Sequence, residues 1–430
     1  MIWKNWSESV HCEPEQYVEP ENISQLQTIV RQANQARRNI RVVGAGHSFT
    51  PLVATSEIMV SLRHLVGIDS IDRNSHYVTV WGGTNLKELG KQLWEQGYAM
   101  ENLGDINKQT IAGAISTGTH GTGIQFGSIS TQVVGMSLLQ ANGDILEINE
   151  ASEGDLLQAA QVSLGMLGII IKVTLKVLPA YQLMAQSYRL SLEDSLQQLP
   201  KLLSNHRNME FYWFPYTNTV QIKTMNVATS KIKPIHQKRH NMFKKVVIEN
   251  GLFWMMSEVS RIVPRSAKAI STISAIGIPV GAETNASHEL FATPRLVKFQ
   301  EMEYSVPVDH LEAILRLIDA TIRKEQYAVH FPIECRFVQA DNSWLSPSYE
   351  RDSAYIAIHM YKGMEFSPYF QTIENILKQF EGRPHWGKMH TMNKQEIQAI
   401  YPRLDDFNVV RRQLDERGIF LNEYLSDLFS

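Results

Sequence analysis

The sequence predicts an α+β protein of two domains, an α/β domain followed by one with an antiparallel sheet and flanking helices. Three observations support this class. The chain has 430 residues, more than one ordinary hydrophobic core accommodates. In the first part of the chain, short apolar runs alternate with helical patterns. In the second part, aromatic segments with alternating apolar positions predominate, as is typical of antiparallel strands.

The elements of the first part follow from periodicity. Residues 24–38 (SQLQTIVRQANQARR) have apolar positions at helical spacing, and IRVVGAG after them predicts a strand that enters a glycine turn. Residues 85–97 predict a helix closed by Gly97. Further strands are expected at 58–63, 77–83, 132–143 and 169–179. Pro179 ends the last of these, so we place the domains at 1–180 and 181–430.

The second part predicts strands separated by helices. A helix is expected over 310–326, and the C-terminal segment 394–420 predicts helices that return over the first domain. Strands are expected within 211–225, 298–308, 330–340 and 354–363.

Composition excludes several classes of protein. Hydrophobic residues make up 43% and charged residues 20%, and the net charge of −3 gives no electrostatic reason to bind nucleic acid. The basic run 231–245 is interpreted as a solvated loop. Cys12 and Cys335 provide neither a disulfide framework nor a paired-cysteine metal site.

No secretory signal and no apolar run long enough to span a bilayer is recognised, so we expect a cytoplasmic protein without an integral membrane segment. The segment 251–263 (GLFWMMSEVSRIV) is the most apolar candidate for peripheral membrane contact. Because Glu258 and Arg261 interrupt it, a buried amphipathic helix is the favoured interpretation.

Two glycine-rich loops indicate a ligand with phosphates. The first, GAGHS at 44–48, is no Rossmann turn, because Pro51 disfavours a helix where that fingerprint requires one. The second, residues 103–123 (LGDINKQTIAGAISTGTHGTG), combines five glycines with few large side chains. Main-chain N–H groups in such loops can hold a pyrophosphate, which suggests a dinucleotide between the two. The alternative is a pair of tightly packed strand–helix turns.

The sequence resembles the vanillyl-alcohol-oxidase-type flavoproteins, with their PCMH-type FAD-binding domain, and within them the aldonolactone oxidase branch. The resemblance covers nearly the whole chain. It is carried by VVGAGHSFTPL, TIAGAISTGTHGTG, FPIECRF followed by WLSP, PHWGKMH, and the terminal YPRLDDF and LDERGIFLNEYL.

The resemblance implies FAD, bonded covalently from the imidazole of His47 to the 8α-methyl of the flavin; a non-covalent contact from His47 is the alternative. The other residues expected to contact FAD are Val43, Gly44, Ala45, Gly46, Ser48, Gly104, Asp105, Thr110, Gly113, Ala114, Ile115, Ser116, His120, Ile169 and Lys388.

A second group of residues is expected to carry the chemistry. Glu334 and Arg336 are two apart in IECRF, so on a strand both point to one face. By themselves they would be an ordinary ion pair, and Lys388 would be a solvated lysine. The resemblance assigns all three to catalysis, with either Glu334 or Lys388 assisting loss of the substrate's hydroxyl proton.

The expected substrate-binding residues are Asp105, Glu334, Arg336, His359 and Lys388. A packed strand histidine is the alternative for His359. No HExxH motif or comparable cluster is present, so no metal is predicted, and His385 and His390 are expected to pack and to support neighbouring groups.

These features predict an FAD-dependent sugar 1,4-lactone oxidase that converts the C2 hydroxyl to a ketone and reduces O₂ to H₂O₂, with enolisation of the product to an ascorbate-like enediol. Gly104 favours oxygen, since family oxidases often have glycine at the matching position. Alternatives are an alditol oxidase, which would take a polyol, a dehydrogenase that reduces a cytochrome or quinone, and a non-enzymatic flavin-binding module. Neither the lactone stereochemistry nor an oligomeric state follows from the sequence.

Overall fold

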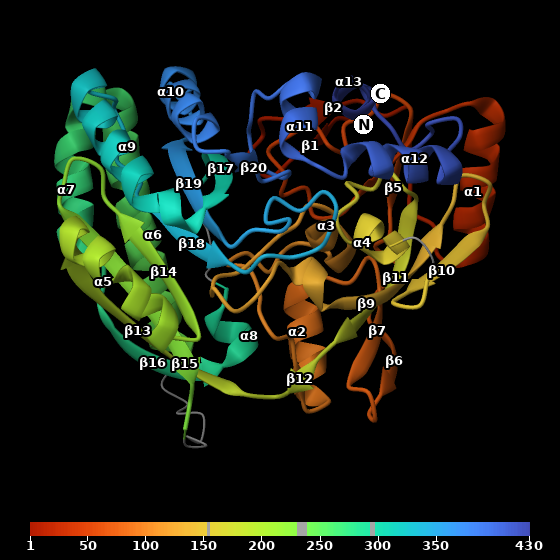
Figure 1. Ribbon diagram of the computed structural model, residues 1–430, viewed down its shortest axis with the longest axis horizontal. Helices are drawn as coiled ribbons and strands as arrows, with labels where there is room; N and C mark the ends of the chain where they lie inside the picture. Colours follow the sequence, from red (N-terminus) through yellow and green to blue (C-terminus); the bar gives the residue numbers. More distant parts are fainter. Residues whose placement is uncertain (153–154, 230–238, 293–296) are drawn as a thin grey trace.

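A computed structural model describes residues 1–152, 155–229, 239–292 and 297–430, with the backbone alone for 239–250. Helices and strands are both abundant, and the predicted α+β class is confirmed (Figure 1). Among the described residues, no helix combines the length and the apolar character that crossing a bilayer requires.

The first half of the chain builds two main sheets. A parallel sheet has the order β3-β5-β4, and an antiparallel sheet has the order β10-β9-β11-β7-β6. The parallel strands are β3 (Gln16–Val18), β4 (Ile40–Val43) and β5 (Ile58–Ser61). The antiparallel strands are β6 (Ile68–Asp72), β7 (Tyr77–Trp81), β9 (Val133–Leu139), β10 (Ile145–Asn149) and β11 (Ile169–Lys176). Short pairs are formed by β1 (Trp3–Lys4) with β2 (His11–Cys12), and by β8 (Tyr98–Ala99) with β12 (Leu178–Pro179).

The helices of this half begin where polar side chains cap them. Asn22 accepts from Gln25 N at 3.0 Å before α1, and Thr110 accepts from Gly113 N at 3.3 Å before α3. Gly97, with φ of +82°, follows α2 as predicted. The helices are α1 (Ile23–Ala36), α2 (Leu86–Glu95), α3 (Ile111–Ser116) and α4 (Leu156–Gln161).

The second half is organised around an eight-stranded sheet of order β16-β13-β15-β14-β18-β19-β17-β20. Its strands are β13 (Gln182–Ser191), β14 (Asn208–Trp213), β15 (Thr219–Val227), β16 (Gly281–Ala286), β17 (Phe299–Pro307), β18 (Ile333–Val338), β19 (Ser353–Tyr361) and β20 (Arg383–Pro384). The chain enters this sheet between β12 and β13, while the predicted domain boundary at residue 180 stays a prediction.

Helices flank this sheet, with α5, α7 and α9 along the left-hand side of the molecule in Figure 1. Their bounds are α5 (Leu192–Asn205), α6 (Arg239–Ile262), α7 (Ala267–Gly277), α8 (Ser287–Leu290), α9 (Leu311–Glu325) and α10 (Ser367–Lys378).

Two sequence predictions fail at α6. The loop expected over 231–245 lies outside the described residues up to 238, and from Arg239 onward the backbone is helical. Residues 251–262 are helical, but the predicted burial of the apolar side chains is wrong. Leu252, Val259 and Ile262 are exposed. The helix is thus turned with large apolar side chains outward.

The C-terminal helices return to the first half of the chain, as Figure 1 shows beside β5 and α1. They are α11 (Lys394–Ile400), α12 (Leu404–Leu414) and α13 (Glu423–Phe429). Ile40 N donates to Ile419 O at 2.7 Å, and Phe420 packs in one core cluster with Leu26 and Val60. The last part of the chain therefore completes the core of the parallel sheet.

Candidate active site

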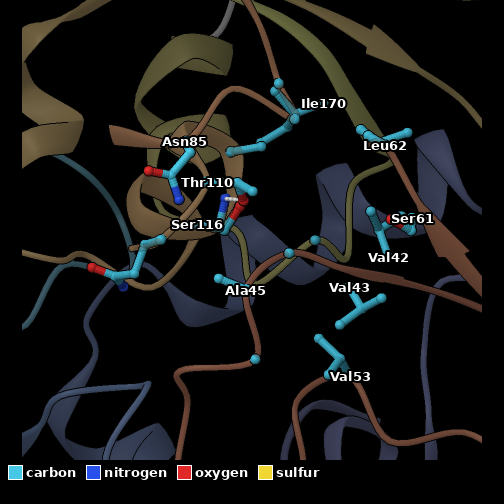
Figure 2. Close-up of a pocket in the computed structure, with 18 of the residues that line it drawn as sticks. Val42, Val43, Ala45, Val53, Ser61, Leu62, Asn85, Thr110, Ser116 and Ile170 are labelled. Carbon is cyan, nitrogen blue, oxygen red and sulfur yellow. Dashed lines mark hydrogen bonds between the residues drawn. The ribbon is translucent and has the colours of Figure 1, made fainter. Parts of the chain in front are cut away.

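A cavity of about 450 Å³ lies among the loops that leave the strands of the first half (Figure 2). Figure 2 shows Ala45, Thr110, Ser116 and Ile170 around this space. Ala45 follows β4, Thr110 and Ser116 lie at the two ends of α3, and Ile170 belongs to β11. The sequence-predicted residues in its lining are Val43, Gly44, Ala45, Gly46, His47, Ser48, Thr110, Gly113, Ser116 and Ile169. Main chain, small side chains and hydroxyl groups thus make up much of the wall.

The loops approach one another so closely that only glycine fits at several positions. A Cβ atom on Gly44 would lie 2.4 Å from Thr110 Oγ1, which brings the two predicted glycine loops into contact. A Cβ atom on Gly83 would lie 2.1 Å from Leu62 O, and one on Gly82 would lie 2.3 Å from Ile170 O. Gly82 and Gly83 also line the cavity, and sequence reasoning missed them although the GG pair directly follows a strand.

A second, smaller cavity of about 60 Å³ adjoins the first. His47, Ser48, Gln109 and Thr117 line both cavities. The sequence-predicted residues Gly104, Asp105, His120, Glu334, Arg336, His359 and Lys388 line the second. A ligand in the first cavity that reaches this junction can therefore present one end to the ionisable groups of the second.

Main-chain contacts between distant segments form the junction. Phe49 N donates to Gly387 O at 2.8 Å, and the Thr50 hydroxyl donates to Trp386 O at 2.9 Å. Met389 N in turn donates to Glu301 O at 3.0 Å, which aligns the HWGKMH segment with β17. These hydrogen bonds hold the first glycine loop and the segment that contains Lys388 next to each other at the junction of the two cavities.

His47 is neutral in this environment. Burial, together with the positive charges of Lys388 and Lys108, lowers the pKa of His47 to about 4. Its ring stacks on Trp6 with the ring centroids 5.7 Å apart. A neutral imidazole at the junction has the lone pair that a nucleophile needs, while the covalent bond to flavin stays a prediction.

Glu334 and Arg336 form an ion pair within a wider charged network. Arg336 Nε lies 3.2 Å from Glu210 Oε2, and Lys223 Nζ lies 2.9 Å from Glu210 Oε1. The Tyr212 hydroxyl lies 3.1 Å from Glu334 Oε1. Burial opposes the charge of Arg336, but the charges of Glu334 and Glu210 raise its pKa well above the ordinary value.

Lys388 pairs with Glu301, and Glu301 also lies 3.4 Å from His359 Nε2 through Oε1. Burial disfavours the carboxylate of Glu301, but the charge of Lys388 and the contacts with His359 hold its pKa below the usual range. His359 is 5% exposed, and its Nδ1 has no hydrogen-bond partner among the described residues. That buried nitrogen is left unsatisfied by the described residues.

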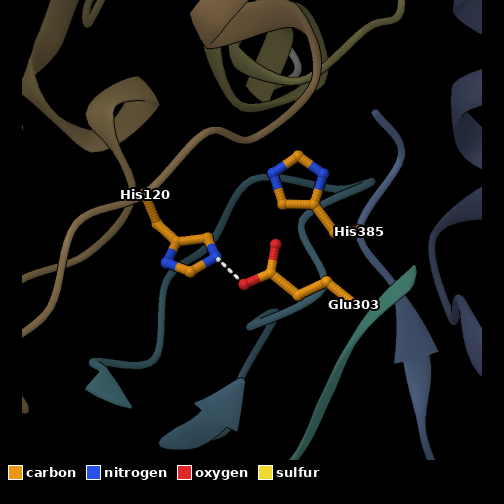
Figure 3. A group of neighbouring side chains, drawn as sticks. All are labelled: His120, Glu303 and His385. Atoms are coloured by element: carbon orange, nitrogen blue, oxygen red, sulfur yellow. Dashed lines mark ion pairs between the residues drawn. The ribbon is translucent and has the colours of Figure 1, made fainter. Parts of the chain in front are cut away.

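His120, Glu303 and His385 form a third buried group, drawn in Figure 3, with the residue types of a metal site. The His120 Nδ1–H donates to Gly121 O at 2.8 Å, and His120 Nε2 lies 3.3 Å from Glu303 Oε1. His385 Nδ1 accepts from Gly387 N at 3.0 Å, so the proton of the neutral ring sits on Nε2. Burial lowers the pKa of His385 to about 3, which keeps the ring neutral. His385 Nδ1 is engaged by the Gly387 amide, so only its Nε2 could bind a metal, and the absence of a metal stays a prediction.

Two of the predicted residues line neither cavity. Ala114 and Ile115 belong to α3 and are fully buried in the hydrophobic core. Conversely, sequence reasoning missed Glu301 and Glu303, which line the second cavity from β17. Their spacing in FQEMEYS, two acids on one face of an apolar strand, is the signal that could have found them.

The first cavity fits FAD by the chemistry of its wall. Glycine turns and hydroxyl groups suit a pyrophosphate held by main-chain donors. Two arginines, Arg41 and Arg63, also line this cavity. The guanidinium group of Arg41 donates to Leu52 O and Leu164 O, so it is engaged by main-chain carbonyls.

Comparisons with known proteins agree with this fit. A family model described as D-arabinono-1,4-lactone oxidase matches residues 173–428, and one described as FAD binding domain matches residues 14–149. An L-gulono-1,4-lactone dehydrogenase of Mycobacterium tuberculosis is 37% identical over 424 residues, 98% of each chain. An L-gulonolactone oxidase of Scyliorhinus torazame is 33% identical, covering 99% of this chain and 98% of the relative.

Among solved structures, cholesterol oxidase from B. sterolicum superposes with a TM-score of 0.80, covering 100% of this chain and 96% of that chain. Its sequence identity is 15%, so this likeness concerns the fold alone.

Proposed function

Because the chain belongs to the D-arabinono-1,4-lactone oxidase family of FAD-dependent oxidoreductases, we propose that it oxidises the C2 hydroxyl of a gulono-type 1,4-lactone and passes the electrons to O₂. The observation that carries the proposal is the junction at His47, Ser48, Gln109 and Thr117, where the FAD-type cavity meets the charged one. Such a junction lets substrate and cofactor meet out of bulk water. When bound, FAD supplies the two-electron acceptor for the hydride that leaves the substrate carbon.

The residues of the second cavity divide into orienting and proton-handling groups. Arg336 and His359 line the second cavity, and their polar groups orient the substrate hydroxyls. Lys388 is held by Glu301 as an ammonium ion, which has no lone pair to accept a proton. Glu334, a carboxylate supported by Arg336 and Tyr212, is therefore the group that accepts the C2 hydroxyl proton in this proposal.

The electron acceptor has two candidates, each with its own support. Gly104 lines the second cavity without a side chain of its own, and this favours access of O₂. The relative that is 37% identical is named a dehydrogenase, and this favours another acceptor. In the first case one O₂ takes two electrons and two protons to become H₂O₂; in the second a cytochrome or quinone takes the electrons.

Rapid-mixing spectroscopy tests the proposal. The purified yellow protein is mixed without oxygen with L-gulono-1,4-lactone, D-arabinono-1,4-lactone or an open-chain alditol, and flavin bleaching is followed. We expect rapid bleaching with a lactone, and then release of one H₂O₂ per flavin on admitting O₂. Bleaching by the alditol alone would reject the lactone. Bleaching by lactone without peroxide, but with cytochrome c reduction, would support the dehydrogenase.

Acid precipitation of the same sample tests attachment. Colour that stays with the polypeptide in the parent protein and moves to the supernatant in His47→Ala supports the bond to His47. Colour released from the parent protein rejects it.

A further inference from the structure

The first residues of the chain form a strap along the first glycine loop. Residues 3–12, the N-terminal strap, comprise β1, the turn after it and β2, and these two strands pair with each other and with no other described strand. Trp6 N donates to Gly46 O at 2.8 Å, and Asn5 Nδ2 donates to Ser48 O at 2.9 Å. The strap therefore holds the carbonyl groups directly before and after the histidine of this loop.

The side chain of Trp6 restrains the histidine ring itself. The rings of Trp6 and His47 are stacked, with their planes at 26° to each other. Trp6 is held in turn by edge contacts with Phe49 and Phe299, whose ring centroids lie 6.4 Å and 5.3 Å from its own. Phe299 belongs to β17 and lines the second cavity. Because these rings keep the indole in place, its stacking limits rotation of the imidazole.

The strap is also fixed internally and tied to the second half of the chain. Asn5 is 4% exposed, and its Oδ1 accepts from Val10 N at 3.0 Å, which closes the turn between the two short strands. The carboxylate of Glu8 lies 2.9 Å from Lys298 Nζ and also pairs with Lys362. Lys298 directly precedes β17, and Lys362 directly follows β19. The position of the strap is therefore defined relative to both halves of the chain.

Such restraint matters for a nucleophile at a junction. His47 lines both cavities, so the orientation of its ring decides whether a nitrogen lone pair points at a ligand in the first cavity. A reacting pair held in the correct orientation reacts much faster than one that must find it. A free imidazole side chain rotates about two bonds, whereas this one has its backbone and its ring both held by the strap.

We propose, on the basis of the bond to His47 in the proposed function, that the N-terminal strap sets the orientation in which the imidazole attacks flavin, and that Trp6 is the positioning residue. In this reaction a nitrogen of His47 bonds to the 8α carbon, while the methyl group and the imidazole each lose one proton. The flavin takes up the two electrons and two protons, and dissolved O₂ then accepts them as H₂O₂, which restores the oxidised flavin. Trp6 exchanges neither protons nor electrons in these steps.

A time course of attachment tests the proposal. The full chain is produced in a riboflavin-starved host, mixed with FAD and sampled into acid, and the flavin fluorescence that stays with the polypeptide is measured. We expect Trp6→Leu to slow attachment by at least about tenfold, because the imidazole loses its orientation. Trp6→Phe keeps a ring for stacking and should lie between Trp6→Leu and the parent protein. FAD affinity before attachment should be unchanged, because Trp6 lines neither cavity.

Trp94→Leu is the matched control. Trp94 is half-buried like Trp6 and also packs its ring on a histidine, His288, with the centroids 5.5 Å apart. It lines neither cavity, so its variant should attach FAD at the parent rate. Melting temperatures establish that the variants are folded. If Trp6→Leu melts below the assay temperature, Trp6→Phe carries the test alone.

The outcomes separate this proposal from the one on which it rests. Attachment at the parent rate in the Trp6 variants would overturn the role of the strap and leave the bond to His47 intact. A loss of FAD affinity as large as the loss of attachment rate would also overturn it, since Trp6 would then belong to the binding site. A parent protein that never retains flavin in acid would reject the bond itself, and the strap's role with it, while lactone oxidation is measured independently.

Discussion

The two adjoining cavities are lined by different kinds of chemical group. The FAD cavity is lined by main chain, glycines and hydroxyl groups from consecutive loops of the first half of the chain. The second cavity is lined by ionisable side chains, several of which pair across neighbouring strands: Tyr212 faces Glu334, Glu210 faces Arg336, and Glu301 faces His359. A cofactor of fixed shape is held by backbone, whereas a reaction that moves charge needs side chains whose charges support one another. The two regions should therefore fail in different ways.

The largest effect is expected from Glu334→Gln, which keeps the shape of the second cavity and removes its proposed proton acceptor. The rate of anaerobic flavin reduction should fall by roughly 10²–10⁴-fold, the usual contribution of a general base. The flavin content should be unchanged, because Glu334 does not line the FAD cavity. Stopped-flow absorbance measures the rate.

Tyr212→Phe is the matched control for Glu334→Gln. It removes one hydroxyl near Glu334 and leaves the carboxylate, so the loss should be about tenfold or less. A Glu334→Gln variant that keeps a tenth of the parent rate would reject Glu334 as the base.

Gly83→Ala is the corresponding test of the FAD cavity. The added methyl group would lie 2.1 Å from Leu62 O, so the strands and loops must shift, at a cost of about 2–3 kcal/mol. We expect weaker FAD retention and a lower melting temperature, with near-normal turnover per bound flavin. Gly277→Ala adds the same methyl group where nothing lies within 4 Å and should behave as the parent protein. Equal FAD content in both variants would contradict the packing argument.

Acid should destabilise the second half of the chain, because two buried neutral histidines, His330 and His385, lie there. Burial lowers the pKa of His330 to about 4 and that of His385 to about 3, whereas the unfolded chain takes up these protons near pH 6.5. The unfolded state thus binds more protons below that pH, so stability falls as the pH drops. Each histidine should cost about 2 kcal/mol between pH 7 and pH 5.

Thermal unfolding at the two pH values measures this loss. His330→Gln should reduce the difference in melting temperature between pH 7 and pH 5. The same difference in both proteins would show that other groups cause the acid sensitivity. Glu301 does not affect this comparison. Because its pKa is lowered in the folded protein, its contribution to stability is lost only when the pH falls below about 5.

The smallest effect is expected at the boundary of the two regions. Gly104→Ala places a methyl group 3.0 Å from His120 O and 3.3 Å from Thr119 Cγ2, which is tight but can be relieved by a small shift of the loop. Reoxidation by O₂ should slow several-fold, about 1 kcal/mol in barrier, and more than reduction by lactone does. Double-mixing stopped flow separates the two half-reactions. Equal slowing of both would remove Gly104 as a determinant of the electron acceptor.

The sequence predicted the two regions unequally, for a physical reason. Glycine loops are local in the chain, so the wall around Gly44 and Gly113 could be predicted in advance. The spacing of Glu334 and Arg336 placed both on one face of a strand, and the family resemblance then assigned them to the site. Their partner Glu210 lies on another strand, and only the register of β14 against β18 brings it near. That register depends on tertiary packing, which periodicity does not encode.

Helix α6 shows the opposite failure. The sequence favoured a buried helix at 251–263, but composition does not determine which side of a helix faces the protein. The inward contacts of Ser257 and Phe253 decide the matter, and they are made with His330 and Phe331 in the loop before β18.

The return of Ile419 and Phe420 to the parallel sheet has a consequence for how the molecule is made. A ribosome synthesises β3, β4 and β5 long before the side chains that close their core. The nascent sheet must wait, incompletely covered, until Ile419 and Phe420 have been added. A chain broken off before Ile419 would thus leave the older part of the protein, and not only the newer part, without its finished form.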